Sequence, residues 1–137
     1  MEAAAASTEI WVLGWSVVLL IAHILVQALS LDLAGDLSVK YLLGPRDENR
    51  ASKSAVAGRL LRSLSNMLET YPAFIALALA LAVTGKTGDL GAVGAMTWLL
   101  ARVAYAILYV AGVPLLRTIV WFVSIIGLVL MVVRLMN

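Results

Sequence analysis

Four long apolar segments, separated by short polar stretches, constrain the fold of this chain more than any other feature. They run from about residue 10 to 33, 54 to 83, 90 to 112 and 114 to 136. Each has the roughly 20 residues that an α-helix needs to cross the hydrocarbon core of a bilayer. Hydrophobic residues make up 63% of the chain and charged residues 13%, whereas soluble domains average roughly 45–50% and 25%. The sequence therefore predicts an all-α integral membrane protein, a single domain over residues 1–137 that forms a bundle of four transmembrane helices in the lipid bilayer.

Composition excludes several other classes of site. The chain has no cysteine, so a disulfide framework, a thiolate nucleophile and a cysteine metal site are excluded, and His23 is its only histidine. We therefore expect no metal site. Basic residues flank the apolar segments instead of clustering with aromatic residues, so no nucleic-acid partner is expected. Glu2 and Glu9, with no Lys or Arg before the first apolar segment, argue against a cleaved signal peptide.

The distribution of Lys and Arg predicts the orientation in the membrane. The polar loop over residues 35–53 contains four basic residues, Lys40, Arg46, Arg50 and Lys53. Basic residues accumulate on the cytoplasmic side of membrane proteins. We therefore predict that this first loop is cytoplasmic and that both termini lie outside.

A line of polar residues interrupts the second apolar segment. It consists of Arg59, Arg62, Asn66 and Glu69. At about 100° per residue these four positions fall within roughly 80° of one another around a helix. Charged residues inside a membrane are expensive, and they are usually functional.

The third and fourth segments contribute further polar residues. Arg102, Tyr105 and Tyr109 share one helical face, and Arg117 follows near the start of the fourth segment. Arg102 and Glu69 lie at a similar depth from the ends of their helices. An intramembrane ion pair between Glu69 and Arg102 is therefore expected.

The balance of intramembrane charges points to an anionic guest. Four arginines, at positions 59, 62, 102 and 117, face one intramembrane acid, Glu69. Polar residues can also serve only to join helices, and Arg59 sits close enough to the helix end to extend toward lipid headgroups. A bundle built for stability alone would not gather surplus positive charge, and arginine is suited to bidentate binding of carboxylates.

The spacing of these residues is also a recognisable pattern. It reads Arg59-x-x-Arg62-x-x-x-Asn66-x-x-Glu69-x-x-Pro72, then Arg102-x-x-Tyr105-x-x-x-Tyr109, then Arg117. The joint pattern resembles the signature of the MAPEG family, the membrane-associated proteins in eicosanoid and glutathione metabolism. The resemblance covers essentially the whole chain, including the four spans and the long first loop.

The resemblance implies a homotrimer that binds glutathione, as co-substrate, between neighbouring subunits and from the cytoplasmic side. By position, the residues that would bind glutathione are Arg62, Asn66, Glu69, Arg102, Tyr105 and Tyr109. Arg117 matches the arginine that stabilises the thiolate in the family's synthases, so it is the expected catalytic residue. A fixed cation lowers the pKa of a thiol from about 8.5 and raises its thiolate fraction.

The expected function is therefore a glutathione-dependent membrane transferase or peroxidase. It would act on a lipophilic small molecule that arrives from the bilayer. One alternative is a non-enzymatic scaffold or anion-binding protein of the same fold. That alternative is favoured because the family's synthases carry an arginine late in the first helix, where the matching region here has only Lys40. A transporter or channel subunit is a further alternative, although no pair of Gly- or Pro-broken helices is present.

Four other residues have structural explanations. We expect His23 to be a packed residue with a satisfied hydrogen bond, for which Gln27, one turn away, is the nearest polar partner. Gly91 and Gly94 should allow close approach of a neighbouring helix. Trp98 lies on the same face as Arg102, where it could line the site, but packing is its expected role.

Overall fold

The computed structural model describes residues 2–137, and within this range it is helical with no strand. The helices are α1 (Glu2–Ala5), α2 (Thr8–Ala34), α3 (Val39–Leu43), α4 (Ala55–Val83), α5 (Asp89–Ala111) and α6 (Pro114–Met136). Four of them, α2, α4, α5 and α6, are long and apolar enough to cross a membrane. The predicted all-α fold class with four candidate spans is confirmed.

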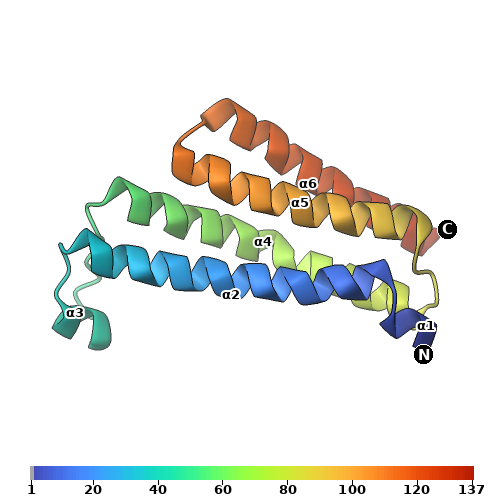
Figure 1. Cartoon of the computed structure of the whole chain (residues 1–137), viewed down its shortest axis with the longest axis horizontal. Helices are drawn as coiled ribbons and strands as arrows, with labels where there is room; N and C mark the ends of the chain where they lie inside the picture. The colour runs from blue at the N-terminus through green and yellow to red at the C-terminus, as the bar shows by residue number, and fades with distance from the viewer. Residues whose placement is uncertain (1) are drawn as a thin grey trace.

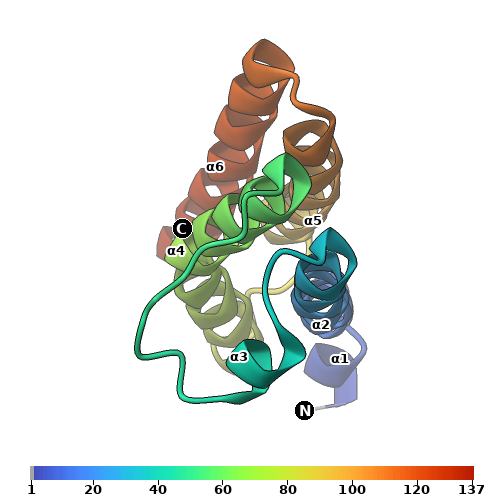
Figure 2. The ribbon, with the colours of Figure 1, turned by 90° about the vertical axis from the view of Figure 1, so that its left-hand side faces the viewer.

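The four long helices run alongside one another in alternating directions (Figure 1). Both termini lie at one end of the bundle, and the loop that contains α3 lies at the other. Helices α4 and α5 each contact the other three long helices. Figure 2, which views the bundle from the α3 end, shows α2 and α6 on opposite sides of the α4–α5 pair. The centre of the bundle therefore lies between α4 and α5, the two helices that carry most of the predicted site residues.

Short polar residues and glycine set the ends of the helices. The hydroxyl of Ser54 accepts a hydrogen bond from the Ala57 N–H at 3.3 Å, which caps the start of α4. At the end of α5, Gly112 adopts φ 77°, a left-handed conformation that glycine tolerates. Pro114 then occupies the first turn of α6, where its missing N–H is not needed. The turn that delivers Arg117 to the bundle is therefore only two residues long.

Stacked aromatic side chains fill the core between α4 and α5. The rings of Phe74 and Trp98 lie nearly parallel with centroids 4.0 Å apart, and the Tyr71 ring lies 5.8 Å from that of Trp98. The Tyr71 hydroxyl also hydrogen-bonds Ser16 on α2 at 2.9 Å. Trp98 is fully buried, which confirms its predicted packing role.

Backbone contact joins α5 and α6. A Cβ atom added at Gly94 would lie 2.5 Å from the carbonyl oxygen of Gly127, and one added at Gly127 would lie 2.7 Å from the carbonyl oxygen of Gly94. Neither distance is compatible with a side chain. The predicted close approach at Gly94 is confirmed, and Gly127 is the residue that meets it.

A buried carboxylate links α2 to α5 at the end of the bundle near the termini. Glu9 is fully buried, and its Oε1 accepts a hydrogen bond from the Gly88 N–H at 2.7 Å. Gly88 is the N-cap residue of α5, so Glu9 satisfies a free donor at that helix end and complements the helix dipole. Gly91 lies directly against Glu9 and leaves room for it, whereas the sequence pattern did not predict this role for Glu9.

Hydrogen bonds to Asp36, which we call the Asp36 clasp, join the two ends of the polar loop at the opposite end of the bundle. Asp36, just after α2, accepts hydrogen bonds from the Ser52 hydroxyl at 2.8 Å and from the backbone N–H of Lys53. These donors, the Lys53 N–H above all, lower the pKa of the Asp36 carboxyl below its usual value. The ionised carboxylate thus ties the start of the loop to the residues that precede α4.

Candidate functional site

Arg102 is the most deeply buried charged residue of the site. Its side chain extends from α5 to α4, where Nη1 donates to Asn66 Oδ1 at 2.7 Å and Nη2 donates to Thr70 Oγ1 at 2.6 Å. Only 2% of Arg102 is exposed. Its guanidinium also lies 5.4 Å from the centroid of the Tyr105 ring. The arginine is therefore held by neutral acceptors and an aromatic face.

The predicted ion pair between Glu69 and Arg102 is wrong. Among residues 2–137, the ion pairs are Arg50–Glu48 and Arg134–Asp89, and neither involves Glu69. Asn66 and Thr70 are one turn apart and both accept from Arg102, whereas Glu69, about 60° from Asn66 around α4, makes no ion pair with that guanidinium. Glu69 lies instead on the exposed surface of the chain. Equal depth on neighbouring helices therefore did not ensure that the two side chains came within ion-pair distance.

A hollow of about 210 Å³ lies between α4, α5 and α6 at the level of these residues. Its lining residues are Asn66, Tyr105, Tyr109, Arg117, Thr118 and Trp121. Asn66 therefore connects the hollow to Arg102 behind it. Four of the residues that the sequence predicted for glutathione binding or catalysis line one cavity.

Two arginines converge on Tyr109. The Arg117 guanidinium lies over the Tyr109 ring, 4.4 Å from its centroid. Arg62 Nε donates to the Tyr109 hydroxyl at 3.3 Å. The ring of Tyr105 meets that of Tyr109 edge-on, with centroids 5.5 Å apart. Tyr109 therefore contacts a cation from α4, Arg62, and a cation from α6, Arg117, and Arg117 lines the hollow itself.

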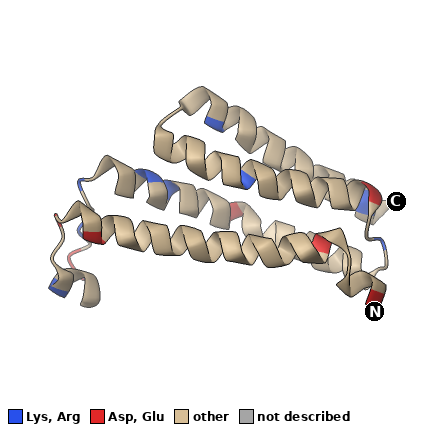
Figure 3. Cartoon of the chain, viewed as in Figure 1, with Lys and Arg blue, Asp and Glu red and all other residues tan. Residues whose placement is uncertain are grey.

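None of these cations has a carboxylate partner in the part of the chain that the structure describes. Both ion pairs among residues 2–137 lie outside the hollow, at the loop and near the C-terminus. Figure 3 shows that charged positions are sparse along the long helices and that basic positions occur on α4, α5 and α6. The surplus positive charge expected from the sequence thus persists in the folded chain, at Arg62, Arg102 and Arg117.

Arg59 has a different role from the one expected. It does not extend away from the bundle toward headgroups. Its Nη1 donates to the carbonyl oxygen of Val110 at 3.1 Å, and its guanidinium lies against Gly112. Arg59 therefore caps the C-terminus of α5, where a cation is favoured by the helix dipole.

Two residues of the site were not predicted from the sequence. Thr70 provides the second acceptor for Arg102. Trp121 lines the hollow, and its Nε1–H is buried without a hydrogen-bond partner. The spacing from Arg117 to Trp121 is one helical turn, so the signal that would have found Trp121 is its position on the same face of α6.

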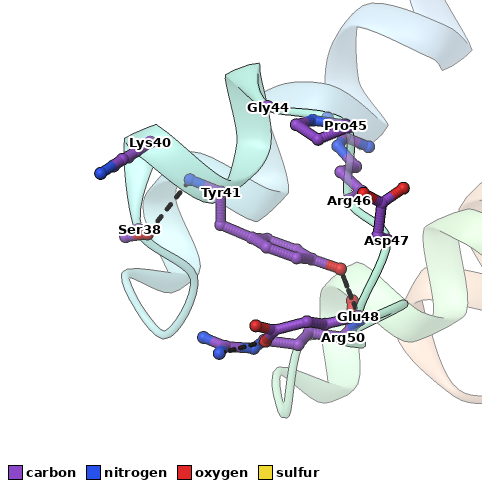
Figure 4. A pocket seen from close by; sticks show the side chains of 9 residues that line it. All are labelled: Ser38, Lys40, Tyr41, Gly44, Pro45, Arg46, Asp47, Glu48 and Arg50. Atoms are coloured by element: carbon purple, nitrogen blue, oxygen red, sulfur yellow. Dashed lines mark hydrogen bonds and ion pairs between the residues drawn. The ribbon is translucent and has the colours of Figure 1, made fainter.

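A second hollow, of about 310 Å³, lies in the loop around α3. Figure 4 shows the side chains that line it, with the contacts of Arg50 to Tyr41 and to Glu48. The Tyr41 hydroxyl accepts from the Arg50 backbone N–H, Arg50 pairs with Glu48, and Arg46 Nη2 donates to the Leu42 carbonyl at 2.7 Å. Lys40 lines this loop hollow and is exposed, so within one chain it lies apart from the hollow between α4 and α6.

The fold and the site define a multi-pass integral membrane protein with a cationic, tyrosine-lined cavity inside its bundle. A model of the MAPEG family matches residues 11–137, and the chain belongs to that family. It is therefore a membrane protein of the family associated with glutathione and eicosanoid metabolism. No curated protein and no solved structure matched the chain.

Proposed function

We propose that the protein is a glutathione-dependent membrane transferase or peroxidase. In this proposal, the hollow between α4 and α6 binds glutathione and Arg117 stabilises its thiolate. The thiolate then attacks a lipophilic electrophile that enters from the bilayer. The loop that contains α3 faces the cytoplasm, and both termini lie outside, following the distribution of basic residues.

The observation that carries the proposal is the position of Arg117. Its guanidinium packs on Tyr109 and has no carboxylate within 4.0 Å among residues 2–137. An unpaired cation in a low-dielectric surrounding stabilises an adjacent anion strongly. A thiol placed against Arg117 would therefore ionise at a lower pH than it does in water.

Glutathione matches the remaining chemistry of the site. It carries two carboxylates, an ammonium group and the thiol, and it is a net anion at neutral pH. Arg62, which is bonded to Tyr109 at the hollow, offers a cation for a carboxylate, and Trp121 offers a free N–H donor, while the buried Arg102 adds positive charge behind Asn66. Glu69, the one acid on this part of α4, is the candidate partner for the ammonium group.

One subunit provides only part of such a site. The hollow of about 210 Å³ is smaller than the roughly 300–1,000 Å³ of typical small-molecule sites. Glu69 is exposed on a membrane-spanning helix, where lipid would leave its charge unsolvated. Both features support a homotrimer in which a neighbouring subunit covers Glu69 and completes the wall of the site.

The decisive experiment is a titration of the purified, assembled protein with glutathione, in which the ultraviolet absorbance of the thiolate and the heat of binding are both measured. We expect binding together with thiolate formation. Arg117→Ala should abolish the thiolate signal and retain much of the binding. Arg62→Ala should weaken the binding itself by about 10- to 100-fold, the loss expected for a hydrogen bond to a charged group.

Arg46→Ala is the matched control, because it removes an exposed arginine of the loop that is remote from the hollow. It should change neither signal. If an assembled trimer binds no glutathione at all, the transferase proposal fails.

A non-enzymatic role remains the second candidate, and one observation favours it. Arg102 already satisfies Nη1 and Nη2 within the chain, as expected for a residue that joins helices. Lys40 is the only cation in the region where the family's synthases carry an arginine, and it lies on a surface loop. Glutathione binding without thiolate formation would support this alternative.

A further inference from the structure

A second groove lies on the other side of α5. It holds about 490 Å³ between α2, α4 and α5, and its walls are almost wholly apolar. Leu19 and Val26 on α2, Leu60 on α4, and Ala106 and Val110 on α5 contribute to these walls. The volume falls within the roughly 300–1,000 Å³ of small-molecule sites.

His23 is the one polar side chain in this groove. It is 6% exposed, and neither Nδ1 nor Nε2 has a hydrogen-bond partner. The expected bond to Gln27 is therefore absent, and the prediction of a satisfied histidine is wrong. The backbone carbonyl of Leu60 is the one protein acceptor near the ring, and even a bond to it would satisfy one ring nitrogen and leave the other without a partner.

An unpartnered imidazole between apolar walls selects for a particular kind of ligand. A neutral imidazole has one N–H donor and one nitrogen acceptor. A buried polar group without a partner costs free energy, and a ligand that supplies the partner recovers that free energy. A hydroxyl group both donates and accepts, so it satisfies either ring nitrogen.

The depth of the groove argues for a neutral ligand. His23 lies eleven residues before Ala34, the end of α2, which places it about 16 Å from that end. This is near the middle of a hydrocarbon core about 30 Å thick, where a charged headgroup would be expensive. Val26 and Ile107 are exposed beside the groove, so it opens laterally, toward lipid tails.

The groove is separate from the proposed glutathione site. Tyr105 and Tyr109 face one hollow, whereas Ala106 and Val110 are turned by about 100° from them around α5 and face the other. The two cavities share no lining residue. Within one chain, a molecule in this groove would therefore not contact Arg117 or the thiolate proposed beside it.

From these observations, we infer that the groove between α2 and α5 is a binding site for a neutral, long-chain lipophilic alcohol whose hydroxyl group hydrogen-bonds His23. The inference does not depend on glutathione binding or on catalysis. It assigns the only histidine of the chain to ligand recognition within the bilayer.

The test uses the assembled protein in lipid nanodiscs and a hexadecanol probe that carries a photoactivatable diazirine in its chain. The label is expected on peptides of α2 and α5 that line the groove. Excess hexadecanol should displace the probe about tenfold more effectively than hexadecane, the factor that one hydrogen bond contributes. Equal competition by the two compounds would overturn the role of His23.

Variants separate recognition from folding. His23→Phe retains an aromatic ring without its nitrogens and should lower labelling about tenfold. Ala106→Trp should block the groove, whereas Gln27→Leu, one turn from His23 but outside the groove, should label like the original chain. Each variant must keep the oligomeric state of the original protein.

A measurement without any variant completes the test. Because His23 is the only histidine, nitrogen-15 labelling of histidine in protein without a polyhistidine tag yields a single imidazole spectrum. Hexadecanol should shift its ring resonances saturably, and hexadecane should not. Absence of a shift and of groove labelling, for instance because a neighbouring subunit covers the groove, would refute the inference.

Discussion

Asn66 Oδ1 accepts a hydrogen bond from Arg102 Nη1 at 2.7 Å and also lines the hollow between α4 and α6. Asn66 therefore serves two neighbours at once, the buried guanidinium on one side and the cavity on the other. Substitutions at Asn66 can therefore separate two properties, the stability of the bundle and the binding of a ligand in the hollow.

Asn66→Ala should lower the stability of the assembled protein by about 1.5–3 kcal/mol, because it removes an acceptor from a buried charge. Asn66→Asp should preserve the thermal midpoint, since a carboxylate still accepts from Arg102. It should nevertheless weaken glutathione binding, because the added negative charge reduces the surplus of cations. Thermal unfolding in detergent and calorimetry measure the two effects, and full glutathione affinity in Asn66→Asp would contradict the charge argument.

Trp121→Phe should reduce glutathione affinity without affecting stability. The substitution retains an aromatic ring and removes the Nε1–H, which has no partner within the chain. We expect a loss of about tenfold, the contribution of one hydrogen bond. Trp15→Phe, on the exposed surface of α2, is the matched control. Equal affinities for Trp121→Phe and the unmodified protein would show that this donor does not reach the ligand.

Gly94→Ala and Gly127→Ala should each destabilise the pairing of α5 with α6. The added methyl group would lie 2.5 Å or 2.7 Å from a carbonyl oxygen of the facing helix. Overpacking of this kind costs roughly 1–3 kcal/mol, which a shift of the thermal midpoint would reveal. Gly14→Ala has no neighbouring atom within 4 Å of its added Cβ and should be neutral.

The Asp36 clasp should depend on pH. Its hydrogen bonds stabilise the ionised carboxylate and lower the pKa of Asp36. The clasp's contribution is therefore complete above the unfolded-state pKa of about 3.9, and it is lost as the pH falls through the lower folded-state pKa. The amide resonance of Lys53 should stay constant at neutral pH and shift only in strong acid.

Asp36→Asn provides a check at neutral pH, because it removes the charge without acidification. The Lys53 amide should then exchange faster with solvent than in the unmodified protein. Asp47→Asn, in the same loop, should leave this exchange unchanged.

Native mass spectrometry from mild detergent tests the assembly. A trimer should appear at about 44 kDa, three times the 14.6 kDa of one chain. Glu69→Gln should not weaken the trimer greatly, because a neutral amide is easier to bury than a carboxylate. A monomer that persists across several detergents would contradict both the trimer and the shared site.

The fold was more predictable from the sequence than the site. Span positions follow from hydropathy, which depends on composition within a window, and helix ends follow from local signals such as Ser54, Gly112 and Pro114. The grouping of Asn66, Tyr105 and Arg117 in one hollow was also foreseeable, but from the resemblance to the MAPEG signature, since helical periodicity places residues on a face of one helix only.

The errors have a common physical origin. Depth along a helix is readable from sequence, but the rotation of one helix against another is not. For that reason the hydrogen bonds of Arg102 to Asn66 and Thr70 were not predicted, and an ion pair with Glu69 was expected in their place. The same limitation applied to Glu9 and His23, whose burial depends on which face of α2 meets its neighbours.

The direct backbone contact between Gly94 and Gly127 has a consequence for how the site can vary. With no side chains between them, α5 and α6 have little freedom to slide, so Tyr105, Tyr109 and Arg117 form a unit of fixed spacing. Substitutions that reshape the opposite wall, on α4 or, in the proposed trimer, on a neighbouring subunit, would leave that unit intact. Such substitutions would change which molecule fits the hollow without moving Arg117, the cation to which we assign stabilisation of the thiolate.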